Sequence, residues 1–192
     1  MKVELLSGTE TVRLQGELTA LIIDAVEHGA SIGFTLPLVR AEVERYWQDV
    51  AGEVAAGRKI LIVAADERGR LLGSAQLSLE SKANGRHRAE VQKVIVRHVA
   101  RGHGVGAALM ARLEQEARAG GRTVLVLDTS TGSGGATVFY RRLGYSFVGS
   151  IPNFAANPDG RLVANAIFYK LLPARGAETT NLTAAPATAV AG

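Results

Sequence analysis

The residues most suited to chemistry lie in one short segment near the middle of the chain, residues 101–106, which reads RGHGVG. This segment runs directly into residues 104–119, where the apolar spacing predicts a helix. Glycines let a backbone lie close to a ligand, and the start of a helix offers unpaired N–H groups and the positive end of a dipole. Together these features favour binding of a phosphate, most naturally a diphosphate, by main-chain amides. A turn that only caps the helix would need one glycine rather than three.

Two other nucleotide-binding patterns fit this segment less well. The P-loop pattern GxxxxGK[ST] is absent, because no Lys-Ser or Lys-Thr pair follows the glycines. A dinucleotide fingerprint is matched in part, since Gly102, Gly104 and Ala107 fit GxGxxA and Asp128 ends the next expected strand. However, three hairpin-like strands precede the loop, where a dinucleotide fold would begin, and too little chain follows Asp128 for the remaining parallel strands. The dinucleotide interpretation stays open as the weaker alternative.

Composition excludes several other kinds of chemistry. The 192-residue chain has no cysteine, which rules out a thiol nucleophile, a disulfide framework and cysteine-ligated metals. Its four histidines show no metal-ligand spacing, so we expect no metal. The net charge of +4 is mild and no aromatic-interleaved basic stripe is present, so we expect no nucleic-acid partner. No segment resembles a membrane helix or a signal peptide, and we therefore expect a cytoplasmic protein without a membrane partner.

The elements that must position the loop alternate between strand and helix patterns. Strands are expected at 3–6, 59–65, 70–79, 88–96, 123–127, 145–151 and 161–171, and helices at 10–27, 38–55, 104–119 and 136–143. This order predicts an α/β (α+β) fold whose mixed sheet is antiparallel in its first half and has helices on its faces. Asn84-Gly85 predicts a hairpin turn between two of the strands.

Strand 88–96 leads directly into the glycine loop. Alternation along it places Val91, Lys93 and Ile95 on one face of the pleat. The opposite face is expected to carry Glu90, Gln92, Val94 and Val96. The chain ends differently: residues 173–192 are rich in Ala and Thr and have little apolar bulk, so we expect a disordered tail after a single domain, 1–172.

Two motifs at this separation resemble those of the GNAT N-acetyltransferases. Residues 101–106 match the R-x-x-G-x-G signature of that family, and residues 136–145, ATVFYRRLGY, are similar to its A-x-x-F-Y-x-x-L-G-F segment. A closer likeness, to the tabtoxin-resistance acetyltransferases, rests on residues 29–34 (GASIGF), 89–93 (AEVQK), 151–155 (IPNFA) and 168–170 (FYK). The resemblance implies the GNAT fold, with a central sheet of about six to seven strands split around an acetyl-CoA site.

For the cofactor, the resemblance implies binding largely by main chain. The diphosphate would be held by amides of the signature loop, at Arg101, Gly102, His103, Gly104, Val105, Gly106 and Ala107. Pantetheine would pair like an added strand with the main chain of Val94, Ile95 and Val96. Ser133 stands where many members carry an asparagine that contacts the cofactor, and it is a candidate for the same contact. The resemblance also makes Tyr140 a cofactor contact, near the sulfur.

For catalysis, the resemblance makes Tyr140 the general acid for the leaving sulfur and a backbone N–H near Val96 the oxyanion donor. Two carboxylates are candidates for accepting the amine proton or binding the ammonium group. Asp128, at the end of its strand, is marginally preferred over Glu90, and the choice stays open. A cross-strand ion pair for Glu90 and a loop cap for Asp128 are the purely structural alternatives.

The acceptor pocket is expected between the first interhelical loop and a late loop, lined by Ser31, Phe34, Asn153 and Phe154 together with Asp128. The predicted function is direct transfer of an acetyl group to a primary amine of a small molecule, with an amino-acid-like toxin or antibiotic as the class that the resemblance indicates. Acetylation of peptide or protein amines and a non-catalytic acyl-CoA sensor are the alternatives. A homodimer paired through the terminal strands is the expected assembly.

Overall fold

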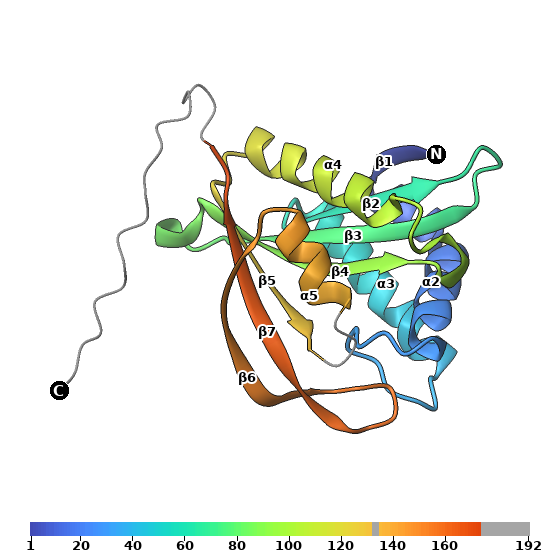
Figure 1. Cartoon of the computed structure of the whole chain (residues 1–192). Coiled ribbons are helices and arrows are strands. Elements are labelled where there is room, and N and C mark those ends of the chain that lie inside the picture. The colour runs from blue at the N-terminus through green and yellow to red at the C-terminus, as the bar shows by residue number, and fades with distance from the viewer. Residues whose placement is uncertain (132–134, 174–192) are drawn as a thin grey trace.

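The central sheet has seven strands in the order β1-β2-β3-β4-β5-β7-β6 (Figure 1). The structure is a computed structural model that describes residues 1–131 and 135–173, so Ser133 and residues 174–192 of the predicted tail lie outside the described residues. The strands are β1 (Lys2–Leu6), β2 (Lys59–Ala65), β3 (Leu71–Leu79), β4 (Arg88–Val96), β5 (Val124–Ser130), β6 (Ser146–Ala156) and β7 (Leu162–Leu171). The helices are α1 (Gly8–Arg13), α2 (Gln15–Glu27), α3 (Arg40–Ala55), α4 (Val105–Ala119) and α5 (Gly135–Arg142). The predicted α/β fold with a mixed sheet is confirmed.

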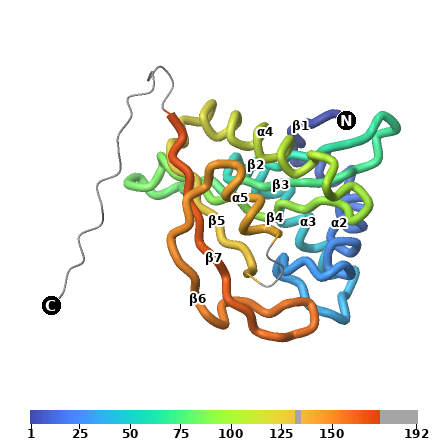
Figure 2. Tube along the Cα trace, in the orientation of Figure 1, coloured from blue at the N-terminus to red at the C-terminus, as the bar shows by residue number. Residues whose placement is uncertain are grey.

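The sheet opens between its two parallel strands, β4 and β5. Pairing between them joins residues 88–90 to residues 124–126 and then stops. Beyond this point β4 continues along β3 as far as Val96, whereas β5 stays paired with β7 as far as Ser130. All other neighbouring strands run antiparallel. The two strands therefore separate after Glu90, and their traces diverge in Figure 2.

Two apolar cores hold the helices against opposite faces of the sheet. Helices α4 and α5 pack on one face, where Leu109 and Leu113 lie with Leu125 and Phe168 of the strands. Helices α2 and α3 pack on the other, where Leu18 and Trp47 are at most 1% exposed. Each side chain on a strand points to one face of the sheet or the other. The face to which each residue of β4 points therefore decides which helices it packs against.

Strand β4 contains a bulge at Lys93 that changes the facing of its side chains. Gln76 of β3 pairs with Gln92, but Ser74 pairs with Ile95, so β4 has one extra residue there. Lys93 adopts a φ of 49°, in the left-handed region. The predicted alternation is therefore wrong beyond this point, because an extra residue shifts the phase of the pleat.

The shift puts neighbouring residues of β4 on the same face. Val91 and Val94 both pack in the core under α4 and α5, whereas Ile95 packs in the core under α2 and α3. Lys93, predicted to share a face with Val91, lies instead beside Gln92 on the α3 side, and both side chains line the same cavity. The bulge thus places two consecutive polar side chains, Gln92 and Lys93, in the lining of the same cavity.

Two further local predictions differ from the structure. Residues 10–27 form two helices rather than one, because Leu14 leaves the helical region with φ −94° and ψ 8°. The Asn-Gly pair lies in a short 3-10 helix, Ala83–Gly85, and not in a two-residue hairpin turn. Glycine is needed at position 85 for space, since a Cβ there would lie 2.6 Å from the Glu80 Cγ.

The predicted late loop is part of a strand. Asn153 and Phe154 belong to β6, whose register with β7 shifts between Ile151 and Ala155. Asn153 absorbs the shift with a φ of 55°. The loop that connects β6 to β7 begins only after Ala156.

Candidate active site

A cavity of about 320 Å³ lies where β4 and β5 separate. It collects side chains from the loop after α2, from α3 and α5, and from five of the strands. The predicted site residues that line it are Ser31, Glu90, Val94, Asp128, Tyr140 and Phe154. Residues predicted as acid, base and acceptor contacts on five different segments of the chain are therefore brought together in one place.

Tyr140 enters the cavity from α5. It is 8% exposed, with its ring 5.8 Å from the ring of Tyr145 and 6.1 Å from that of Phe168. Burial raises the pKa of the Tyr140 phenol well above its ordinary value, and the nearby Asp128 charge raises it further. The phenol therefore stays protonated at neutral pH and can donate, but not accept, a proton.

The two carboxylates stand on the separating strands. Glu90 is at the last paired position of β4, and Asp128 lies on β5 beyond it. The side-chain amide of Asn165, on β7, donates a hydrogen bond to the Asp128 carboxylate and fixes its direction. Within the described residues neither carboxylate forms an ion pair, so the structural alternative of a cross-strand pair for Glu90 is not formed there.

Two lysines that the sequence did not single out also line the cavity. Lys59 on β2 donates hydrogen bonds from Nζ to Oε1 of Gln92, at 2.8 Å, and to Oε1 of Gln76, at 3.1 Å. Lys93 Nζ lies 5.7 Å from the centre of the Tyr46 ring. Burial lowers the pKa of both ammonium groups, and for Lys93 the charges of Asp128 and Glu90 act in the opposite direction.

Tyr46 and Asn165 are two further polar side chains in the lining of the cavity that were not predicted as site residues. Tyr46 on α3 donates to Oε1 of Gln76 at 3.0 Å, and burial raises its pKa to about 12. Asn165 is 5% exposed, although it lies on a strand of mostly apolar residues. A polar side chain inside an apolar strand pattern was the available signal for both Asn165 and Lys93.

The main chain of the glycine loop, residues 101–106, is left uncovered by side chains at Gly102 and Gly104, at the start of α4. Gly102 and Gly104 have φ values of +80° and +79°, and a Cβ on either would meet nothing within 4 Å. Gly104 is the N-cap of the 15-residue helix α4. Free space over unpaired amides at a helix N-terminus is what an anionic diphosphate needs, so these residues fit the cofactor that the resemblance implies.

The remaining residues of the loop have more local roles. The Arg101 Nε donates to the Val96 carbonyl at 3.3 Å, and the His103 Nδ1 lies 2.9 Å from the Arg101 carbonyl. Val105 is buried in the core, so only its main chain faces outward. Gly106 allows close packing, since a Cβ there would lie 3.2 Å from the Phe139 ring of α5. Ala107 is exposed on the first turn of α4.

Several predicted residues lie around the cavity rather than in its lining. Phe34 packs edge-on against Tyr46, with ring centres 5.6 Å apart, and supports that wall. Asn153 is exposed on β6, and the Ile95 side chain is buried under α2 and α3. Val96 packs in the opposite core, beside the glycine loop. The Ser31 hydroxyl donates to the carbonyl of Ala156 at 3.3 Å, which ties the first interhelical loop to the end of β6.

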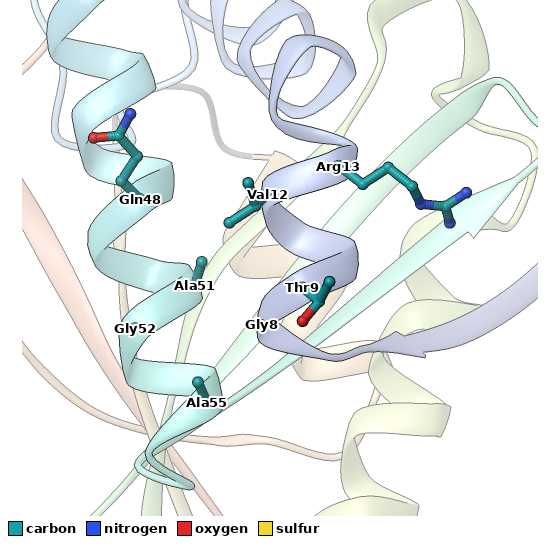
Figure 3. A pocket seen from close by; sticks show the side chains of 8 residues that line it. All are labelled: Gly8, Thr9, Val12, Arg13, Gln48, Ala51, Gly52 and Ala55. Atoms are coloured by element: carbon teal, nitrogen blue, oxygen red, sulfur yellow. The ribbon is translucent and has the colours of Figure 1, made fainter.

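A second hollow, of about 580 Å³, lies between α1 and α3 and offers little chemistry. It is lined by Gly8, Thr9, Val12, Arg13, Gln48, Ala51, Gly52 and Ala55, and the Arg13 side chain points away from α3 (Figure 3). A Cβ on Gly8 would lie 2.8 Å from the Ala51 carbonyl oxygen, so small residues here serve close helix packing.

The described residues provide neither a cluster of metal ligands nor a membrane-spanning helix. In the part of the chain that the structure describes, no group of three or more His, Asp or Glu side chains could hold a metal ion. None of the helices within residues 1–131 and 135–173 combines the length and the apolarity that crossing a bilayer requires.

Comparison with known proteins gives a consistent set of relatives. The sequence model of the acetyltransferase (GNAT) family matches residues 20–145. An uncharacterized N-acetyltransferase of the hisH–hisA intergenic region of Azospirillum brasilense is 37% identical over 107 residues, which are 55% of this chain and 61% of that protein. The L-methionine sulfoximine/L-methionine sulfone acetyltransferase of Pseudomonas aeruginosa is 30% identical over 135 residues, covering 70% of this chain and 76% of that protein.

Solved structures show the same architecture. The phosphinothricin acetyltransferase of Sinorhizobium meliloti, solved in complex with AcCoA, superposes with a TM-score of 0.72 at 21% identity, over 94% of both chains. At that identity the likeness concerns the fold. The chain spans less than two thirds of the length of the Azospirillum relative.

Proposed function

This chain belongs to the acetyltransferase (GNAT) family, and we propose that it transfers an acetyl group from acetyl-CoA directly to the primary amine of a small, amino-acid-like molecule, in detoxification or resistance. The observation that carries the proposal is the meeting of Tyr140, Glu90 and Asp128 in one cavity where β4 and β5 separate. The methionine sulfoximine and phosphinothricin acetyltransferases among its relatives support an amino-acid-like acceptor.

Acetyl-CoA fits the main chain around the split in the sheet, and when bound it supplies the acetyl group as an activated thioester. We assign its diphosphate to the amides of residues 101–107, over which Gly102 and Gly104 leave open space. Beyond Glu90 the edge of β4 has no strand beside it in the described part of the chain, so the main chain of Val94, Ile95 and Val96 is available to pantetheine. Ser133, outside the described residues, stays a candidate for a further contact.

Different side chains of the cavity carry out the two proton transfers, one to the departing sulfur and one from the attacking amine. Tyr140 keeps its proton because burial raises the pKa of its phenol, and as the general acid it protonates the departing sulfur. Asp128, oriented by Asn165, accepts the proton of the attacking amine, with Glu90 as the alternative acceptor. Since the chain has no cysteine, transfer without a thiol-bound enzyme intermediate is the natural route.

A thiol-release assay with acetyl-CoA and a panel of amines tests this function. The panel should include amino acids, simple amines and short peptides, with acetyl-CoA binding measured separately by calorimetry. Release of CoA that depends on a small amine supports the proposal. Tight binding without release from any amine would favour the sensor alternative, and release with peptides alone would favour peptide or protein amines.

We also propose a homodimer formed through the β6–β7 hairpin. Strand β6 lies at the edge of the sheet, and large apolar side chains of both strands are exposed, among them Val148 (63%), Leu162 (58%) and Leu171 (66%). An edge strand with such a surface is open to association with a second copy. Sedimentation analysis should find a dimer, and Val148→Asp should shift it toward the monomer; a monomeric wild-type protein would contradict the assignment.

A further inference from the structure

The ammonium group of Lys93 lies in the cavity without a hydrogen-bond acceptor among the described residues. Its Nζ makes none of the hydrogen bonds or ion pairs found among the described residues, and its closest aromatic neighbour is Tyr46. The neighbouring Lys59 differs, because its ammonium is bound by the side-chain oxygens of Gln76 and Gln92. Partial burial disfavours the charged form of this ammonium, so a ligand that supplies an acceptor would gain from pairing with it.

The backbone is bent to put Lys93 in this position. Its φ of 49° is uncommon for a residue other than glycine. Such conformations cost free energy and persist where the surrounding structure imposes them, often at binding sites. Gly33 on the facing loop leaves the room that the side chain needs, since a Cβ there would lie 3.3 Å from the Lys93 Nζ.

The cavity also carries charges of both signs. Lys93 and Lys59 lie in the same lining as Glu90 and Asp128, and the two carboxylates favour the charged form of Lys93. No ion pair joins Lys93 to either carboxylate in the described part of the chain. A ligand with a positive and a negative group a few bonds apart would satisfy both ends, and a volume of about 320 Å³ suits a small molecule.

We infer that Lys93 binds the carboxylate of the acceptor, which makes a free α-carboxylate a requirement for good substrates and directs their amine toward Asp128 and Glu90. This inference rests on the proposed function and deepens it, because it names the chemical group that selects the acceptor and the residue that binds it. Lys59, which already donates to Gln76 and Gln92 with two of its three N–H groups, positions Gln92 and adds to the positive field.

Matched pairs of acceptors test the inference on the wild-type protein. Each α-amino acid of the panel, L-methionine sulfone included, is compared with its methyl ester and with its decarboxylated amine. Loss of the carboxylate should lower kcat/KM by roughly 10- to 100-fold, the range of a hydrogen bond between charged groups. Equal rates for acids, esters and amines would overturn the role of Lys93 and leave the proposed function intact.

Substitutions then assign the effect to Lys93. Lys93→Met should raise KM for the amino acids by roughly 10- to 100-fold and should affect the decarboxylated amines much less, whereas Lys93→Arg should restore part of the affinity. Lys82→Met removes the same charge from the exposed turn between β3 and β4 and is the matched control. Equal losses on acids and amines would overturn the inference, since they would indicate a role in the proton transfers instead.

A binding measurement separates this inference from the proposed function. Calorimetric titration of the amino acids into protein saturated with CoA detects the carboxylate contact without turnover. Binding that weakens in Lys93→Met supports the inference even if no amine is acetylated. Binding that is equal in wild type and variant contradicts it even if acetylation occurs.

Discussion

The two parts of the proposed site, the main chain assigned to the cofactor and the cavity assigned to the acceptor, are built by different means. On the side assigned to the cofactor, the surfaces are main chain: a glycine loop at the start of α4 and an edge of β4 without a neighbouring strand in the described residues. On the side assigned to the acceptor, the surfaces are side chains, with Tyr46, Lys59 and Lys93 coming from three separate elements. Main-chain binding depends on glycine and local geometry, whereas side-chain binding depends on elements far apart in the sequence meeting in the fold.

Removal of the Tyr140 hydroxyl should have the largest effect, because this group takes part in the chemical step. Tyr140→Phe should lower kcat by roughly 10²- to 10⁴-fold, the range of general acid catalysis. The dissociation constant for acetyl-CoA and KM for the acceptor should change little. Steady-state kinetics with calorimetry measure all three values. Tyr145→Phe is the control, since its ring packs 5.8 Å from that of Tyr140; a wild-type kcat for Tyr140→Phe would remove this residue from the mechanism.

A side chain added to the glycine loop should weaken only the binding of acetyl-CoA by the main chain. In Gly104→Val a β-branched residue would have to adopt a φ of +79° at the N-cap of α4, and it would cover the amides. We expect acetyl-CoA affinity to fall by about 100-fold or more, as several charge-assisted hydrogen bonds are lost. Gly69→Val, at a φ of +80° in the β2–β3 turn, imposes the same backbone strain away from the site. Retained affinity in Gly104→Val, measured by calorimetry, would contradict the loop assignment.

Neutralisation of the carboxylates should distinguish their roles on the acceptor side. Asp128→Asn keeps the size of the side chain but removes the charge that Asn165 orients. We expect kcat/KM for the acceptor to fall by roughly 10- to 100-fold, with acetyl-CoA affinity unchanged. Glu90→Gln should have the smaller effect of the two. The reverse order in the same kinetic assay would transfer the role of proton acceptor to Glu90.

The same division explains what could be predicted from the sequence. The glycine loop and Tyr140 belong to short segments whose residues are adjacent along the chain, so motifs locate them, whereas the split in the sheet was implied only by the resemblance to the family. Lys93 was placed on the wrong face because β4 has one extra residue relative to β3. Such a bulge is a property of two paired strands, so the periodicity of one strand does not reveal it. Asn153 was placed in a loop for a similar reason, since the shift in register between β6 and β7 is a property of two strands together.

The acceptor side was therefore predicted in part only. Ser31, Phe154, Glu90 and Asp128 were identified because they flank recognisable loops and strand ends, and they line the cavity. Lys59 begins an ordinary strand, and nothing local distinguishes it from a surface residue. Asn165 interrupts an apolar strand pattern, but the pattern does not show which residue it contacts. Their partners, Gln92 for Lys59 and Asp128 for Asn165, lie 33 and 37 residues away along the chain.

The smallest expected effect is a difference in pH dependence between the two sides. Amides do not titrate, so acetyl-CoA affinity should be constant as the pH rises from neutral, whereas Lys93 can bind a carboxylate only while it is charged. Burial lowers the pKa of Lys93, so its charge is lost at a lower pH than that of an exposed lysine. KM for a carboxylate-bearing acceptor should accordingly rise by a few-fold at alkaline pH. Because arginine keeps its charge throughout this range, the ratio of wild-type KM to that of Lys93→Arg isolates the lysine from the titration of the substrate amine, and a constant ratio would mean that Lys93 does not hold the carboxylate.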